Sequence, residues 1–260
     1  MSRASLSLVL AAGAVALGGQ AATAATIAAL QDGQKIVWID TDQKKVTGSV
    51  ALGGSAKVVG IDVRPSDGKL YGVTGDGQIV TIDAKSGKWE KKSQLSEKLS
   101  AVSMISVDFN PVADRMRIIS GDGMSLRVNV DDGKAIVDGA LKYADADAMK
   151  GTAPQAVAAG YTNSFAGTKE TALYDIDRTH GTLVKQAPPN DGILNTVGKL
   201  GVKLDGPVAF DIWADGKGAN VGWMLTGGVL HSVDLATGAA KVVGKIAELD
   251  GKVTDMAILP

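Results

Sequence analysis

Residues 58–87 read VVGIDVRPSDGKLYGVTGDGQIVTIDAKSG, and this stretch decides the fold. Its three apolar runs, at residues 58–63, 69–73 and 78–83, are separated by Pro-Ser-Asp-Gly and by Gly-Asp-Gly. Short apolar runs between such clusters predict β-strands joined by tight turns. The stretch is therefore predicted to be a three-stranded meander, and about five versions of it follow one another along the chain.

A second pattern repeats along the whole chain: an apolar residue followed by Asp or Asn closes the third run of each version. The pairs are Ile39-Asp40, Ile82-Asp83, Val128-Asn129, Ile176-Asp177 and Val233-Asp234. A glycine stands four residues after the polar residue in every copy except the first, which has Lys44. Successive pairs are 43, 46, 48 and 57 residues apart. These intervals match the roughly 40–50 residues of a four-stranded propeller blade.

The run that opens each version carries a further marker, an aspartate. Asp62, Asp108, Asp211 and Asp255 hold this position in four versions, whereas the version that opens with AVAAGYTN lacks it. The first version has a third run without an opening run, and residues 253–259 form an opening run with nothing after it. Together the two partial versions make one complete unit.

The sequence therefore predicts an all-β protein: a five-bladed β-propeller closed by pairing the N- and C-terminal strands in one blade. Closure removes the exposed sheet edges that promote aggregation. A β-sandwich does not need a repeat in register, and a parallel α/β fold needs helices whose apolar period is missing here. The long connection at residues 131–155 holds Asp138, Asp145 and Asp147. We expect it to cross one face of the ring, either as a solvated loop or as a functional one.

The N-terminus has the pattern of an export signal. Arg3 precedes an apolar run at residues 6–17, and Ala22-Thr23-Ala24 fits a cleavage site. We expect residues 1–24 to be a secretory signal peptide and residues 25–260 to be a single propeller domain, periplasmic or extracellular. The apolar run is too short for a transmembrane anchor. A formal net charge of −1 argues against nucleic acid as a partner.

Several segments resemble a known family. They are DFNPVADRMRIIS at residues 108–120, GIDVRPSDGKLYG at 60–72, LRVNVD at 126–131, YTNS at 161–164 and LYDID at 173–177. They are similar to domain-of-unknown-function family 4394, a group of exported bacterial proteins, and along the chain they run in the family's order. The resemblance covers nearly all of the chain after the signal. It implies a propeller-like all-β domain and assigns no activity, substrate or catalytic residue.

The four repeated acids are the first candidate site. If they face the central channel, Asp62, Asp108, Asp211 and Asp255 offer the oxygen ligands that Ca²⁺ prefers. The alternative is structural, because a repeated Asp often accepts backbone N–H bonds and is repeated with the blade. With two histidines and no cysteine, a zinc or copper site is not expected. The sequence predicts no cofactor, with Ca²⁺ as the alternative.

Residues that break the repeat are the second candidate site. Arg115 and Arg117 are two apart on one strand and share a face. A surplus arginine near the channel suits a carboxylate or phosphate ligand. Alternatively the arginines pair with the acid ring, Arg117 with Asp108. The ligand-binding candidates are Asp108, Asn110, Arg115, Arg117, Arg64, Tyr161 and Asn163.

No single catalytic set stands out, since a G-x-S-x-G elbow, a P-loop and a dinucleotide fingerprint are all missing. The leading hypothesis is an exported binding or interaction module for an unknown small molecule or protein. One alternative is a periplasmic hydrolase or lyase at the channel mouth, using Asp108 or Asp211 with Arg117, with or without Ca²⁺. The other alternative is a structural envelope protein.

Overall fold

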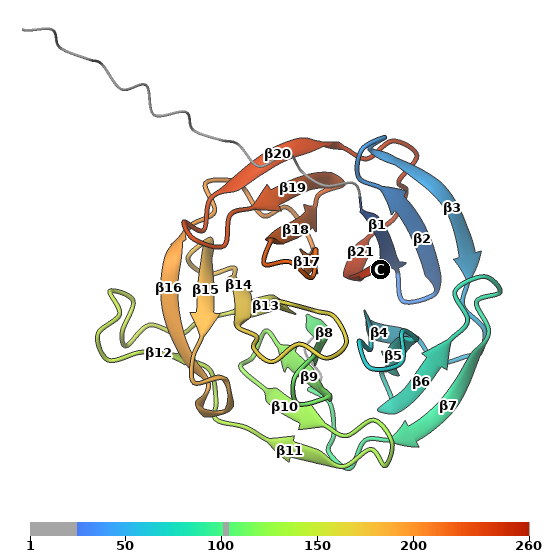
Figure 1. The fold of residues 1–260 in the computed structure, drawn as a ribbon, viewed down its shortest axis with the longest axis horizontal. Coiled ribbons are helices and arrows are strands. Elements are labelled where there is room, and N and C mark those ends of the chain that lie inside the picture. The colour runs from blue at the N-terminus through green and yellow to red at the C-terminus, as the bar shows by residue number, and fades with distance from the viewer. Residues whose placement is uncertain (1–24, 101–103, 260) are drawn as a thin grey trace, which may run out of the picture.

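The computed structural model describes residues 25–100 and 104–259. Within these ranges five small sheets stand in a ring, so the chain is an all-β, five-bladed propeller, as predicted (Figure 1). The only helix in the described ranges is a single 3₁₀ turn, η1 (Pro189–Asp191). The predicted signal peptide, residues 1–24, lies outside the described residues.

In each blade the strands follow one another from the axis outward. The inner strands are β4 (Val58–Val63), β8 (Ile105–Asn110), β13 (Ala156–Tyr161), β17 (Val208–Ala214) and β21 (Val253–Leu259). The second strands are β5 (Leu70–Thr74), β9 (Arg115–Ser120), β14 (Leu173–Asp177), β18 (Asn220–Thr226) and β1 (Thr26–Gln31). The third strands are β6 (Gln78–Ile82), β10 (Ser125–Val128), β15 (Thr182–Gln186), β19 (Val229–Val233) and β2 (Lys35–Asp40). The outer strands are β7 (Trp89–Gln94), β11 (Ala135–Val137), β16 (Ile193–Lys199), β20 (Ala240–Lys245) and β3 (Lys45–Ala51).

We number the blades in chain order, starting with the one that holds both ends of the described chain. Blade 1 is β21-β1-β2-β3, blade 2 is β4–β7, blade 3 is β8–β11, blade 4 is β13–β16 and blade 5 is β17–β20. A short strand, β12 (Lys142–Tyr143), adds a fifth strand to blade 4 by pairing in parallel with β16.

Burial decreases from the axis outward, and this explains why the sequence shows three apolar runs per blade instead of four. All of β5 is buried, whereas the outer strand β7, WEKKSQ, has no buried residue. Inner strands lie between neighbouring blades and are buried on both faces, so apart from their aspartates they read as nearly continuous apolar runs. The outer strands face solvent and are too polar to stand out in the sequence.

Blade 1 is closed by the two ends of the described chain, as predicted. β21 pairs antiparallel with β1, with Thr26 opposite Leu259 and Ala28 opposite Ala257. β1 continues outward to β2 and β3. The inner strand of this blade therefore comes from the C-terminal end, and the other three come from the N-terminal end (Figure 1).

Each seam between neighbouring blades has its own apolar cluster. Between blades 2 and 3, Tyr71 packs edge-on against Phe109, with ring centroids 5.4 Å apart. Between blades 3 and 4, Ile119 packs with Tyr161 and Leu194. Packing between blades therefore stabilises the ring, and the polar groups that meet at the axis or within a seam are placed by this packing.

One predicted turn lies at the wrong strand. Ile176-Asp177 closes β14, the second strand of blade 4, whereas the other four pairs close third strands. Its turn joins the second and third strands, β14 and β15, whereas the other four turns join third and fourth strands. It therefore lies on the opposite face of the propeller. The physical reason is that an Asp-x-x-x-Gly segment favours a tight turn between any two strands. The pattern identifies a turn and not its place in a blade.

The sequence predicted that the connection at residues 131–155 crosses one face of the ring, and this prediction is wrong. It forms β11 at the outer edge of blade 3 and β12 at the outer edge of blade 4. Backbone bonds from Gly139 N to Asn190 O (3.0 Å) and from Ala144 N to Leu194 O (2.8 Å) fasten it to blade 4. We call residues 138–144 the strap, because they tie blade 3 to blade 4.

Candidate functional site

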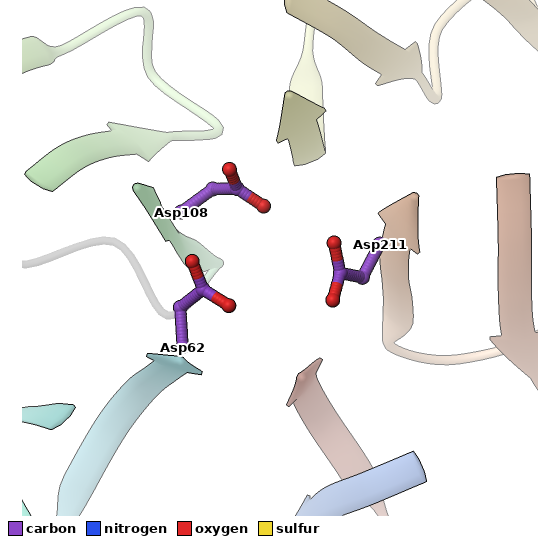
Figure 2. A group of neighbouring side chains, drawn as sticks. All are labelled: Asp62, Asp108 and Asp211. Atoms are coloured by element: carbon purple, nitrogen blue, oxygen red, sulfur yellow. The ribbon is translucent and has the colours of Figure 1, made fainter. Parts of the chain in front are cut away.

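Three of the four predicted acids meet at the centre of the ring. Asp62 lies on β4, Asp108 on β8 and Asp211 on β17, and their carboxylates point into the space between the inner strands (Figure 2). One oxygen of each lies within 4.8 Å of the others. All three side chains are buried. We call Asp62, Asp108 and Asp211 the central triad.

Each triad carboxylate accepts a hydrogen bond from the next inner strand around the ring. Phe109 N donates to Asp62 Oδ2 (2.7 Å), and Tyr161 N donates to Asp108 Oδ1 (3.1 Å). Ile258 N donates to Asp211 Oδ2 (2.7 Å). The same contact recurs at three seams, so these acids link each blade to its neighbour. It also satisfies backbone donors that are buried at the axis.

Asp255 does not take the equivalent place, contrary to the prediction. Ile258 N donates to Asp211 in the same way that Phe109 N donates to Asp62, so Ile258 corresponds to Phe109. The residue before each is then also equivalent, and Ala257 holds the position in blade 1 that Asp108 holds in blade 3. Asp255 is two residues earlier, at the place of Ser106. A shift of two residues keeps a side chain on the same face of a strand, and so the sequence pattern hides it.

Asp255 nevertheless links blades in its own way. Its Oδ2 accepts hydrogen bonds from Ile61 N (3.0 Å) and Val107 N (3.2 Å), on the two following inner strands. Ser106, at the corresponding place, accepts one from Ala159 N (3.1 Å). Asp255 is thus a second type of link between inner strands and does not belong to the central triad.

Burial dominates the electrostatics of the ring centre. Desolvation, followed by repulsion from the other acids, raises the pKa of Asp62 and of Asp108 well above the usual range. Burial also raises the pKa of Asp211, to about 6, although its backbone hydrogen bonds oppose this. Carboxylates this close cannot all ionise without a compensating charge. Chemically, the triad can share protons or hold a cation through oxygen.

The predicted ligand arginine Arg64 pairs with acids of the next blade. Its Nε and Nη2 donate to the carboxylate of Asp114 (2.8 and 2.6 Å), and Nη2 lies 3.4 Å from Asp131. The hydrogen bond from Arg64 is the main cause that lowers the pKa of Asp114. Both acids lie in turns of blade 3, so Arg64 connects blades 2 and 3.

Asn110 and Arg115 stand apart from the triad and have local roles. The Asn110 side-chain oxygen accepts bonds from Val112 N (3.0 Å) and Ala113 N (2.8 Å), which makes it the first residue of an Asx turn. Arg115 is exposed and donates to backbone carbonyls of the same turn. Neither side chain shares a site with the acids.

Arg117 is buried, but its partner differs from the predicted one. It stands opposite Asp108 in the β8–β9 ladder, yet its ion pair is with Asp138 at the start of the strap. Asp138 also accepts Arg127 Nε (2.8 Å), so one buried carboxylate serves two arginines. Arg117 has three further acceptors, which are Ser125 Oγ (2.9 Å), Asn190 Oδ1 (3.0 Å) and Tyr161 OH (3.3 Å).

The polar residues of the odd version also join blades. The Tyr161 hydroxyl accepts from Arg117 of blade 3. Asn163 faces blade 5: its N–H donates to Asn220 Oδ1 (2.7 Å), and Asn220 Nδ2 donates back to Asn163 Oδ1 (2.9 Å). Tyr161 and Asn163 therefore link blade 4 to its two neighbours through contacts of a different kind from those of the central triad.

Sequence reasoning did not single out Asp114, Asp131 and Asp138 as the acids that pair with these arginines. They lie in turns or in the long connection, where acids are common, and only the fold brings them to the arginines. The length of the connection at residues 131–155 was the one available signal for Asp138.

A pocket of about 230 Å³ opens at the seam between blades 5 and 1. Its walls come from residues 205–207 before β17, from the end of β18 with the β18–β19 turn, and from residues 249–253 at the start of β21. Pro207, Leu225, Leu249 and Val253 form the apolar part. A hydrogen bond from Thr226 Oγ1 to Asp205 O (2.9 Å) holds two walls together. We call this the seam pocket, and no sequence pattern pointed to it.

None of the helices described in the structure has the length and apolar character needed to cross a bilayer. A search of curated proteins finds no match. The chain is similar in fold to a protein of unknown function from Bacteroides thetaiotaomicron, with a TM-score of 0.50 and 15% identity. That match covers 83% of this chain and 53% of the other, so this chain spans about half the length of that protein.

Two further solved structures are less similar. One is a protein of unknown function from Bacteroides caccae, at 13% identity and a TM-score of 0.42, with 85% of this chain and 72% of that chain covered. The other is described as an auxiliary nutrient binding protein from Bacteroides ovatus, at 18% identity and a TM-score of 0.46, with 73% and 50% covered. The model of one family matches residues 35–257, nearly the whole ring. The chain therefore belongs to the DUF4394 family, whose members share a domain of unknown function.

Proposed function

We propose that this protein is an exported binding module without catalytic activity, and that it takes a small molecule in the seam pocket. The observation that carries the proposal is the pocket itself, a concave space of about 230 Å³ with apolar walls and few polar groups. Small-molecule sites have this composition. Loops on a rigid scaffold, such as those that line this pocket, commonly bind ligands.

The surroundings of the candidate polar residues favour binding over catalysis. A catalytic acid or base has to reach a substrate. The triad carboxylates are buried and accept backbone N–H groups, and Arg64 and Arg117 are engaged by acids of the protein itself. These contacts support the binding module over the hydrolase or lyase.

A ligand screen tests the proposal. Residues 25–260 are mixed with panels of amino acids, monosaccharides and small carboxylic acids, and the melting temperature is recorded. A ligand that binds the native state raises it by mass action. Lys252→Trp places a large ring at the pocket wall and should weaken binding of any hit at least about tenfold. Lys241→Trp, on the exposed strand β20, is the matched control. If Lys252→Trp leaves the binding of a hit unchanged, that ligand does not bind in the seam pocket, and the proposal is contradicted.

A second function, divalent cation binding, is favoured by the geometry of the central triad. Two oxygens that bind one Ca²⁺ ion lie at most about 4.6–5.2 Å apart, because each Ca–O distance is about 2.3–2.6 Å. The three triad oxygens, all within 4.8 Å of one another, are close enough together to share one ion. The backbone N–H bonds to the carboxylates would orient them as ligands. We propose that the ring centre takes Ca²⁺, with Asp62, Asp108 and Asp211 as its protein ligands.

Metal analysis and melting curves test the cation proposal. Calcium should co-purify with the protein, and a chelator should lower the melting temperature. Asp108→Asn should abolish the response to the chelator. Asp145→Asn should not, because Asp145 is an exposed partner of Lys150 at the outer rim. A protein without metal and without any response to chelator contradicts the proposal, and the triad then shares protons instead.

A further inference from the structure

A buried carboxyl group without a protein partner lies between blades 3 and 4, away from the seam pocket and outside the central triad. Asp175 sits in the middle of β14 and has no exposed surface. Among the described residues, neither carboxylate oxygen has a hydrogen-bond partner. A buried polar group without a partner costs about 1–3 kcal/mol, more when it is charged. Such a group calls for a partner that the protein itself does not supply.

A second orphaned oxygen lies beside it. Gln186 on β15 is 1% exposed, and its Oε1 also has no partner among the described residues, although its Nε2 donates to Pro189 O (2.6 Å). Asp175 is opposite Val184 in the β14–β15 ladder, and Gln186 is opposite Leu173. The two polar side chains are therefore diagonal neighbours on one face of the sheet, and diagonal pairs are within reach of long side chains.

This face is turned toward blade 3, where Arg117 provides the complementary groups. The positive charge of Arg117 acts on Asp175 and opposes the effect of burial, which raises the pKa of that carboxyl to about 8. Among the described residues, however, the guanidinium makes no hydrogen bond to Asp175. A guanidinium has five N–H donors, and the bonds to Tyr161, Ser125, Asp138 and Asn190 use four. One donor remains on Arg117.

We propose that the seam between blades 3 and 4 holds buried water that bridges Arg117, Asp175 and Gln186. The occupant has to donate to several oxygens and accept from an N–H group, and water does both. A metal cation would satisfy the oxygens, but the charge of Arg117 repels it. A larger ligand has no route, because Asp175, Gln186 and Arg117 are at most 1% exposed. The water joins the two blades through bonds that neither makes directly.

A high-resolution crystal structure of residues 25–260 tests the proposal. We expect electron density for at least one water within about 3.2 Å of Asp175 and of either Gln186 or Arg117. Three results would overturn it. These are a direct hydrogen bond of Asp175 to Gln186 or Arg117, a dry seam, and density with the short, many-oxygen coordination of a metal ion.

Two variants at one position give an independent test in solution. Asp175→Asn keeps groups that bond water, whereas Asp175→Leu has similar size and none. If the seam holds water, Asp175→Leu should melt several degrees below Asp175→Asn, because it leaves the water and Gln186 without a partner. If Asp175→Leu melts at or above Asp175→Asn, the seam is dry and the proposal fails. Neither variant touches the seam pocket or the central triad, so this outcome is independent of the proposed functions.

Discussion

At the scale of single residues, aspartate has several roles in this ring, and its surroundings decide which one. Asp62 accepts backbone N–H groups at the axis, Asp138 neutralises arginines, and Asp83 caps an exposed turn through Lys85 N (2.9 Å) and Ser86 N (2.8 Å). Each of these three carboxyl groups has hydrogen-bond donors in the place where it lies. Asp175 is the exception among the buried acids of the described residues, since both of its oxygens lack one.

Gly60 takes, in blade 2, the place that Asp255 takes in blade 1, and only a glycine fits there. A Cβ atom at Gly60 would overlap Val107 and stand 2.9 Å from Asp255 Oδ2. We expect Gly60→Ala to lower the free energy of unfolding by about 1–3 kcal/mol, since overpacking a tight contact has this cost. Urea unfolding measures it. The control is Gly75→Ala, where the nearest atom, Val59 Cγ1, is 3.6 Å away. Equal losses in the free energy of unfolding for Gly60→Ala and Gly75→Ala would show that the space around Gly60 is not crowded.

Asp175 makes stability depend on pH with a definite sign. Its folded pKa is about 8, whereas the unfolded chain releases this proton near pH 4. Between these values the native state binds more protons, so the free energy of unfolding falls as pH rises. The loss from this one group is at most about 1.4 kcal/mol per pH unit.

Comparison with Asp175→Asn isolates this effect, because the other buried acids contribute equally to both proteins. Urea unfolding is measured at several pH values between about 5 and 8. We expect the wild-type stability to fall more steeply with pH than that of Asp175→Asn. Parallel profiles for the two proteins would show that Asp175 has no raised pKa in the native ring.

At the scale of elements, the strap is fastened by one buried ion-pair cluster. The Asp138 side chain is 3% exposed and serves both Arg117 and Arg127. Asp138→Asn leaves buried positive charge without a counter-charge. We expect a loss of about 3–5 kcal/mol in the free energy of unfolding, measured in urea.

An exposed pair at the outer rim is the matched control for the strap. In the ion pair of Asp145 with Lys150, the side chains are 96% and 58% exposed. Asp145→Asn should leave the free energy of unfolding almost unchanged, because exposed surface ion pairs contribute little. A small effect of Asp138→Asn, close to that of the control, would show that the cluster does not hold the strap.

For the whole molecule, the decisive feature is the closure of blade 1. Thr26 and Leu259 are directly opposite each other in the β1–β21 ladder. A disulfide from Thr26→Cys with Leu259→Cys encloses almost the whole ring, and the chain has no native cysteine to interfere. The control is Lys35→Cys with Ala51→Cys, an opposed pair in the same blade that closes a short loop.

The two disulfides should differ in the stability that they add, because they close loops of different length. Constraining a longer loop removes more entropy from the unfolded chain, so the ring-closing bond should add about 2 kcal/mol more than the short one. Urea unfolding with and without reductant measures both increments. If the Thr26–Leu259 disulfide does not form under oxidation, the strands are not paired in solution.

The sequence by itself determined the local and repeating features of this protein. Turn residues such as the Gly-Asp-Gly at 75–77 set the strand ends, and the repeat interval set the number of blades. The partial versions at the two ends predicted the closure. Turn preference and apolar alternation act over a few residues, so they can be read directly from the chain.

The tertiary structure alone decided which polar groups meet. A two-residue shift moves Asp255 out of the triad without changing its face, and the partner of Arg117 proved to be Asp138, not Asp108. The seam pocket and the orphaned oxygens of Asp175 arise where separate blades come together. Contacts across a seam depend on how whole sheets pack, and the pattern within one strand carries no record of the neighbouring blade.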